Sequence, residues 1–169
     1  MRIAFIYPAF ESLAIEYLSA VARKGGHEVA VILDPCLFSD SFLTVRPLAR
    51  LFSMKDRILK QALDFKPDLV AFSVVTTDFQ WFRETAGMLR GRIVAPFIAG
   101  NIHVTSAPEE TLKFGLLDAA VRGEGELVFA DVLESLQKDG RIDPAIDNLA
   151  VAENEAVRLN PLRPLIDDL

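Results

Sequence analysis

The chain has 169 residues, the size of one domain, and 51% of them are hydrophobic, which is enough to build a core. The formal net charge of −6 argues against a nucleic-acid-binding protein, which needs a basic face. The single cysteine, Cys36, cannot form an internal disulfide, so we expect a reducing compartment, the cytoplasm. No apolar run reaches the roughly 18 residues that span a membrane.

Short apolar runs alternate with segments of helical periodicity. The apolar runs predict strands, in chain order, at residues 2–7, 28–33, 68–73, 92–99 and 118–122. Helical spacing predicts helices at residues 11–24, 54–65, 78–89, 108–114 and 124–138. Gly25-Gly26 and Asp139-Gly140 would end the first and last helix, and Asp78 would be an N-cap. Residues 34–53 form a long connection, which in a compact domain is usually functional, mobile or partly helical.

Continuous apolar strands that alternate with helices indicate a parallel sheet covered on both faces. Right-handed crossovers then give an open, doubly wound α/β domain, and five strands suit the flavodoxin-like order 2-1-3-4-5. Pro96 conflicts with a central strand at 92–99, because proline removes a ladder donor. The tail differs, since residues 146–160 could form two short strands around Glu153-Asn154. We therefore expect an α/β domain at 1–140, then a short β extension and linker at 141–169.

In open parallel sheets, ligands bind beyond the carboxyl ends of the strands. The informative loops are therefore those at 7–14, 73–81, 99–110 and 122–126. The chain has no GxGxxG, GxxxxGKS/T or GxSxG motif, no acidic pair of a phosphorelay receiver and no zinc-ligand spacing. Acid–base catalysis by groups of this chain therefore has little support.

Each candidate also has a structural interpretation. Residues 123–126, Gly-Glu-Gly-Glu, could be a turn into a helix whose glutamates complement the dipole, or a loop on which a flat ligand lies. Ser73 and Thr77 could cap a helix or donate to a ligand at the mouth of a cavity. His103 alone would more often be an exposed loop residue than a ligand, and His27 would be structural.

Four segments together resemble a known family. They are SLAIEYLSAVARKGGHEVAVI, DLVAFSVVTT, FIAGNIHVTSAPEETL and DAAVRGEGE, in this order on the five-strand pattern. The chain resembles, over residues 1–140, the cobalamin-binding domain at the N-terminus of B12-dependent radical SAM enzymes. The pairing of Gly-x-x-His-x-Thr-x-x-Pro-Glu with Gly-Glu-Gly-Glu is more specific than either motif alone. LRPLIDDL is similar to the linker before the radical SAM barrel.

The resemblance implies a cofactor and a partner domain. Cobalamin, as methylcobalamin, would lie across the carboxyl ends of the strands and serve methyl transfer or a related radical reaction. The wider superfamily has Asp-x-His-x-x-Gly after the first strand, whereas residues 8–13 here contain no histidine, which implies base-off, His-off cobalamin. CxxxCxxC is absent, so a 4Fe-4S cluster and S-adenosylmethionine would bind in a missing downstream radical SAM domain of the same parent chain. We expect no catalytic and no metal-ligating residue in this chain.

The same resemblance implies the residues around the cofactor. The first loop would lie near the lower face of the corrin, and Ser73 and Thr77 would line a slot for the nucleotide tail. Residues 100–103 would border the tail or the corrin edge, and residues 123–126 would offer backbone amides. The expected cofactor-binding residues are Pro8, Ala9, Phe10, Glu11, Leu13, Ser73, Val75, Thr76, Thr77, Gly100, Asn101, His103, Gly123, Glu124, Gly125 and Glu126.

Two other functions remain open. The domain could be a flavodoxin-like binding or scaffold module without cofactor, or a corrinoid carrier for a separate methyltransferase. A crowded cavity at the strand ends would favour the scaffold. A roomy slot between the third and fourth strands would favour cobalamin. The absent axial histidine counts against the carrier.

Overall fold

The computed structural model describes residues 1–8, 12–37, 45–154 and 156–164. The described strands are β1 (Arg2–Pro8), β2 (Glu28–Asp34), β3 (Leu69–Ser73), β4 (Phe97–Gly100), β5 (Ala119–Val121), β6 (Leu149–Glu153) and β7 (Ala156–Leu159). The described helices are α1 (Leu13–Lys24), α2 (Arg46–Leu51), α3 (Lys55–Phe65), the 3-10 turn η1 (Thr76–Asp78), α4 (Phe79–Arg90), α5 (Ile102–Ser106), α6 (Pro108–Leu112) and α7 (Glu126–Asp139).

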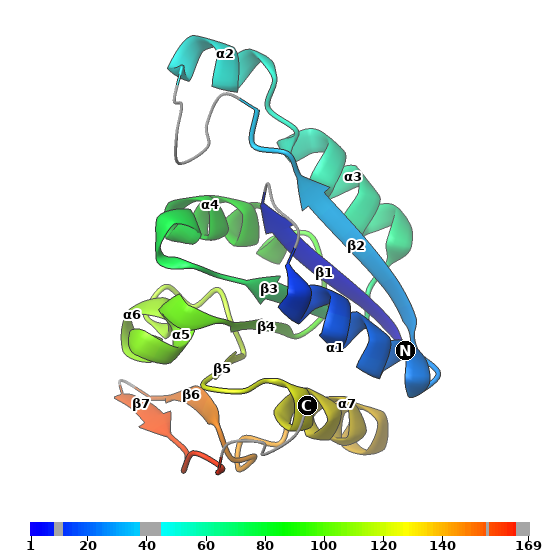
Figure 1. Cartoon of the computed structure of the whole chain (residues 1–169), viewed down its shortest axis with the longest axis vertical. Helices are drawn as coiled ribbons and strands as arrows, with labels where there is room; N and C mark the ends of the chain where they lie inside the picture. Colours follow the sequence, from blue (N-terminus) through cyan, green and yellow to red (C-terminus); the bar gives the residue numbers. More distant parts are fainter. Residues whose placement is uncertain (9–11, 38–44, 155, 165–169) are drawn as a thin grey trace.

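All of these strands belong to one sheet, in the order β2-β1-β3-β4-β5-β6-β7 (Figure 1). The first five pair in parallel in the order 2-1-3-4-5, which confirms the predicted doubly wound α/β fold. The two strands expected in the tail also form, and Asn154 takes a φ of 55° in the turn between them. They pair antiparallel and continue the same sheet, so the sheet has two more strands than the five predicted.

Helices cover both faces of the sheet because each strand alternates its apolar side chains. Ile3 and Phe5 of β1 face the layer of α1 and α7, whereas Ala4 and Ile6 face the layer of α3 and α4. Alternate residues of β3 and β4 divide in the same way. The long connection is partly helical, and its helix α2 stands apart from these layers beyond β2 (Figure 1).

The helix ends follow the sequence signals in most places. Ser12 caps α1, since its Oγ accepts from the Ile15 amide at 3.4 Å. Gly26 and Gly140 take positive φ after α1 and α7, as expected for glycine at a helix end. Asp78 precedes α4, but its side chain caps no helix amide and instead accepts from the Thr77 hydroxyl at 3.2 Å. Asp78 therefore occupies the predicted N-cap position, but its side chain does not cap the helix.

Two elements around β4 differ from the prediction. The strand begins at Phe97 and not at Arg92, because Pro96 has no amide to donate; its carbonyl instead accepts from the Val70 amide at 3.0 Å. Beyond β4, a short helix, α5, forms where the sequence indicated a loop. Within the described part of the chain, no helix has the length and apolar character needed to cross a membrane.

Candidate functional site

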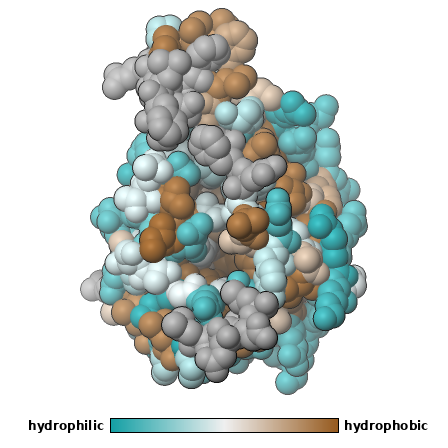
Figure 2. Space-filling model, in the orientation of Figure 1, coloured by the Kyte–Doolittle hydropathy of each residue, from teal (hydrophilic) through white to brown (hydrophobic). Residues whose placement is uncertain are grey.

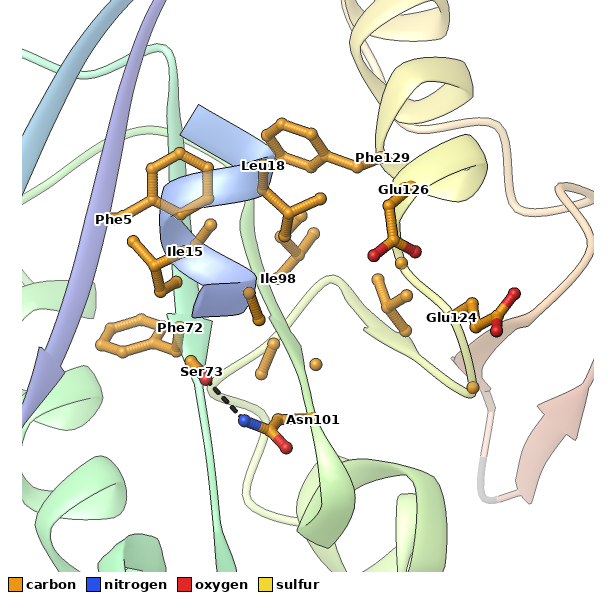
Figure 3. A pocket seen from close by; sticks show the side chains of 17 residues that line it. Phe5, Ile15, Leu18, Phe72, Ser73, Ile98, Asn101, Glu124, Glu126 and Phe129 are labelled. Carbon is orange, nitrogen blue, oxygen red and sulfur yellow. Dashed lines mark hydrogen bonds between the residues drawn. The ribbon is translucent and has the colours of Figure 1, made fainter. Parts of the chain in front are cut away.

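A cavity of about 210 Å³ lies at the carboxyl ends of the central strands, between the sheet and the helices α1 and α7 (Figure 3). Figure 2 shows the molecule hollowed near its centre, with apolar groups on both sides of the hollow. The residues that line the cavity are Phe5, Ala14, Ile15, Leu18, Ala71, Phe72, Ser73, Ile98, Ala99, Gly100, Asn101, Val121, Gly123, Glu124, Gly125, Glu126 and Phe129. The cavity therefore lies where open parallel sheets bind ligands.

The inner wall of the cavity is apolar. Phe5 and Ile98 come from the strand face that packs on α1 and α7, and Leu18 and Phe129 come from these two helices. The rings of Phe5 and Phe129 pack with their centroids 5.5 Å apart. An apolar wall of this kind suits a flat, poorly hydrated group, and polar side chains contribute only where the strands end.

Two glycines leave room in the cavity. A Cβ built on Gly100 would lie 3.6 Å from Val121 Cβ, and one built on Gly125 would lie 4.0 Å from Leu18 and from Val121. These are ordinary packing distances, and neither glycine has a positive φ. Neither the backbone nor the packing therefore requires glycine at these two positions. A larger side chain at either position would extend into the cavity.

Asn101 fixes the loop after β4. Its φ of 89° and ψ of −175° lie in a region that favours glycine, at a cost of about 1–3 kcal/mol. Its side-chain amide donates to Ser73 Oγ at 2.8 Å, and its Oδ1 accepts from the Ile102 amide at 2.6 Å. The second contact caps α5, and the first leaves the Ser73 hydroxyl with its own proton to donate.

His103 lies on α5 and is only 7% exposed, so the interpretation of an exposed loop residue is wrong. Its ring centroid is 4.1 Å from that of Phe79, its Nδ1 is 3.4 Å from Thr76 Oγ1, and its amide donates to the Val74 carbonyl at 3.2 Å. His103 is not a lining residue of the cavity. Its contacts instead join the loop after β3 to the loop after β4.

The segment 123–126 forms one side of the mouth. Gly123 has a φ of 70°, which favours glycine, and its amide donates to Thr105 Oγ1 at 3.0 Å. This amide is therefore engaged within the protein, contrary to the expectation that it is available to a ligand. Glu126 begins α7, and its Oε2 is buried without a hydrogen-bond partner among the residues that the structure describes. In Figure 3 its carboxylate points down from α7 into the space between the labelled side chains, whereas that of Glu124 points away from this space.

The structure brings some of the expected residues together and separates others. Those that line the cavity are Ser73, Gly100, Asn101, Gly123, Glu124, Gly125 and Glu126. Those outside its lining are Pro8, Leu13, Val75, Thr76, Thr77 and His103. Ala9, Phe10 and Glu11 lie outside the described residues. The role of every one of these residues in binding stays a prediction.

Sequence reasoning missed the apolar wall. Ala71 and Ile98 lie two residues, and Phe5 three residues, before the end of their strands, and all three share one face of the sheet. This alternation was a usable signal, because it places all three beneath the same strand ends. Leu18 and Phe129 gave no comparable signal, because helical spacing marks a buried face and does not say which end of the sheet it covers.

Two titratable groups near the sheet edges are perturbed. Burial raises the pKa of Asp78, next to the loop after β3, although the Thr77 hydroxyl opposes this shift. Burial, together with the N-terminal ammonium, lowers the pKa of His27, which precedes β2 at the opposite edge of the sheet. Among the described residues, no three His, Cys, Asp or Glu side chains are grouped so as to hold a metal ion.

The fold and the cavity together define a cofactor-binding α/β domain. The model of the family described as B12 binding domain matches residues 3–133, so the chain belongs to the B12-binding domain family. The predicted resemblance is therefore confirmed.

The relatives are longer proteins. The chain is 30% identical to the uncharacterized methyltransferase PH0819 of Pyrococcus horikoshii, covering all of this chain and 36% of the relative. It is 27% identical to the cytidylyl-2-hydroxyethylphosphonate methyltransferase of Streptomyces wedmorensis, covering 93% of this chain and 30% of that one. The chain thus spans about a third of the length of these relatives.

Solved structures share the fold. The radical S-adenosylmethionine methyltransferase TsrM of Kitasatospora setae, with cobalamin and a 4Fe-4S cluster bound, aligns with a TM-score of 0.73 at 17% identity. The alignment covers 98% of this chain and 30% of TsrM. The cobalamin-dependent radical enzyme OxsB, with aqua-cobalamin and S-adenosylmethionine bound, also aligns with a TM-score of 0.73 at 17% identity, over 96% of this chain and 22% of OxsB.

Proposed function

We propose that this chain binds cobalamin at the carboxyl edge of its sheet. The observation that carries the proposal is the cavity between the ends of β3 and β4 and the helices α1 and α7, in a chain of the B12-binding family. The cobalamin hypothesis requires a roomy slot between β3 and β4, whereas the scaffold hypothesis requires a crowded or closed cavity. The cavity reaches both strands, although its volume is only about 210 Å³, so its position is what supports cobalamin over the scaffold.

The residues present fit this cofactor. Ligand pockets typically measure about 300–1,000 Å³, so a cavity of about 210 Å³ takes a part of a large ligand and not the whole. The apolar wall suits the flat base of the nucleotide tail, and Gly100 and Gly125 leave the space for it. The corrin ring would lie outside the cavity, over the strand ends. When bound, cobalamin supplies a cobalt centre that can carry a methyl group.

This chain's own residues hold and orient the cofactor. Ser73 has a hydroxyl proton to donate, and Asn101 keeps that hydroxyl in place. We propose a base-off, His-off state, because a nucleotide base held in the cavity cannot ligate the cobalt, and residues 8–13 after the first strand contain no histidine. His27 lies at the opposite edge, and the ring of His103 is packed against Phe79.

The methyltransferase names of the relatives and their greater length support a larger role. We propose that the parent protein carries a downstream radical SAM domain with a 4Fe-4S cluster and S-adenosylmethionine. Residues 1–140 would hold methylcobalamin beside that domain, and residues 141–169 would lead into it. Methyl transfer is the proposed reaction and the cytoplasm is the proposed compartment.

A titration of the purified chain with hydroxocobalamin and with methylcobalamin tests the proposal. We expect saturable binding, a shift of the absorption spectrum to the base-off form, and corrinoid that co-elutes with the protein in gel filtration. The absence of both the spectral change and co-elution at micromolar protein would refute it.

A further inference from the structure

Glu126 places an unpaired acceptor in the wall of the cavity. The residue lines the cavity and is the first of α7, and its Oε2 is buried without a hydrogen-bond partner among the described residues. Leu18 and Phe129 line the cavity beside it. Figure 3 shows the carboxylate pointing down from α7 into the space between the labelled side chains.

No residue in the described part of the chain satisfies this oxygen. The start of α7 offsets negative charge through the helix dipole, but the dipole leaves the lone pairs of Oε2 without a donor. Two polar donors at the mouth are already engaged, since the Asn101 amide donates to Ser73 and the Gly123 amide donates to Thr105. Buried acceptors in proteins nearly always have a donor, so an unpaired one in a cavity wall indicates a donor on the ligand.

We propose that Glu126 accepts a hydrogen bond from a neutral donor of the bound corrinoid, and so helps to select it. This inference rests on the proposed function. The donor is a hydroxyl or an amide N–H, because a carboxylate accepts from such groups and repels an anion. Cobalamin offers both, as ribose hydroxyls on the nucleotide tail and as carboxamides on the corrin ring.

Absorbance titrations with two probes identify the donor. Hydroxocobalamin carries the ribose and the corrin amides, whereas cobinamide carries the amides and lacks the nucleotide. We expect Glu126→Ala to weaken hydroxocobalamin binding by about 10- to 100-fold, the range for one hydrogen bond to a charged group. Glu126→Gln should lose less, because it keeps one carbonyl acceptor. If cobinamide binding is unchanged in Glu126→Ala, the donor is the ribose; if it falls equally, the donor is a corrin amide.

The matched control is Glu134→Ala, which removes the same charge from an exposed position of the same helix. Circular dichroism and thermal unfolding of the apo variants show whether each remains folded, and Glu126→Gln keeps the test valid if the alanine variant does not. Binding of both probes by Glu126→Ala within about twofold of the unaltered chain would overturn the inference. Failure of the unaltered chain to bind hydroxocobalamin would instead refute the proposed function, and this inference with it.

Discussion

The two edges of the sheet are built from the same strands but treat their polar groups differently. At the amino edge, the Asp68 carboxylate accepts from the Arg2 amide and the Asp118 carboxylate from the Phe97 amide, each at 2.7 Å. The Asp68 and Asp118 amides donate back across the same pairs of residues. The Arg90 guanidinium also donates to the Asp118 carboxylate, at 2.8 Å. These residues are satisfied by one another.

The carboxyl edge is satisfied only in part. Asn101 holds a backbone conformation that favours glycine, and Gly100 and Gly125 leave space that a side chain could fill. Glu126 has a buried oxygen with no partner among the described residues. Stability alone explains the amino edge and leaves these features of the carboxyl edge unexplained. The difference indicates that the amino edge maintains the fold and that the carboxyl edge is completed by a ligand.

The largest effect that this comparison predicts is from Gly125→Leu. Among the described residues, a Cβ at this position meets only Leu18 and Val121, both in the cavity wall, so the leucine side chain would occupy the space of the ligand. We expect hydroxocobalamin binding to weaken by at least about 100-fold, equivalent to roughly 2.8 kcal/mol, in an absorbance titration. The apo chain should unfold at nearly the same denaturant concentration.

The control for this variant is Gly91→Leu. Gly91 ends α4 with a φ of −75°, and a Cβ there would meet no atom within 4 Å. Because α4 begins after β3 and ends before β4, this residue lies at the amino edge. Equal loss of binding in both leucine variants would contradict the assignment of the space at Gly125 to the ligand.

Asp118→Ala should reverse the pattern. It leaves the buried Phe97 amide without an acceptor and removes a partner of Arg90, so we expect the free energy of unfolding to fall by about 1–3 kcal/mol. Urea denaturation measures this loss. Cobalamin affinity of the folded fraction should stay unchanged.

The matched control is Asp64→Ala, at an exposed site on α3. A similar fall in its free energy of unfolding would show that the destabilisation by Asp118→Ala is not specific to the strand edge.

Local periodicity was sufficient to predict most of the fold. The apolar runs that became β1, β2, β3 and β5 alternate with helices, and this pattern alone indicates a parallel sheet. Helix α5 escaped prediction because its N-cap, Asn101, is held by Ser73, a contact between residues distant in sequence. The start of β4 was placed too early, although Pro96 had already signalled the conflict.

The site was predictable at its mouth and less so in its depth. The polar and glycine residues at 73, 100–101 and 123–126 stand at the ends of strands or between a strand and the next helix, at places that the sequence marks. The wall contributed by Leu18 and Phe129 depends on how α1 and α7 dock, and the unpaired oxygen of Glu126 depends on which donors lie nearby. Neither property is a matter of local sequence, so both emerge only from the packed structure.

A smaller effect is expected from His103→Ala. His103 lies outside the lining but joins the loops after β3 and β4 through Thr76, Phe79 and Val74. Its loss should loosen Ser73 and Asn101 and weaken hydroxocobalamin binding by about two- to tenfold, up to roughly 1.4 kcal/mol. The absorption spectrum of the bound cobalt should not change. A large spectral shift would show that His103 ligates the metal, against its place in the fold.

The smallest effect concerns pH at the amino edge. Burial and the N-terminal ammonium, whose nitrogen is 3.4 Å from His27 Nδ1, lower the pKa of His27 below 6.5. The unfolded chain therefore binds a proton more readily than the folded chain, so the contribution of His27 to stability is complete above pH 6.5 and declines as the pH falls toward the lowered pKa. Urea denaturation of the unaltered chain and of His27→Gln at several pH values isolates the slope of the free energy of unfolding against pH, which should disappear in the variant.

Cobalamin affinity should not follow the same titration, because His27 and the cavity lie at opposite ends of the strands. If binding did track it, the two edges would be coupled, and the separation between a fold-maintaining edge and a ligand-completed edge would fail.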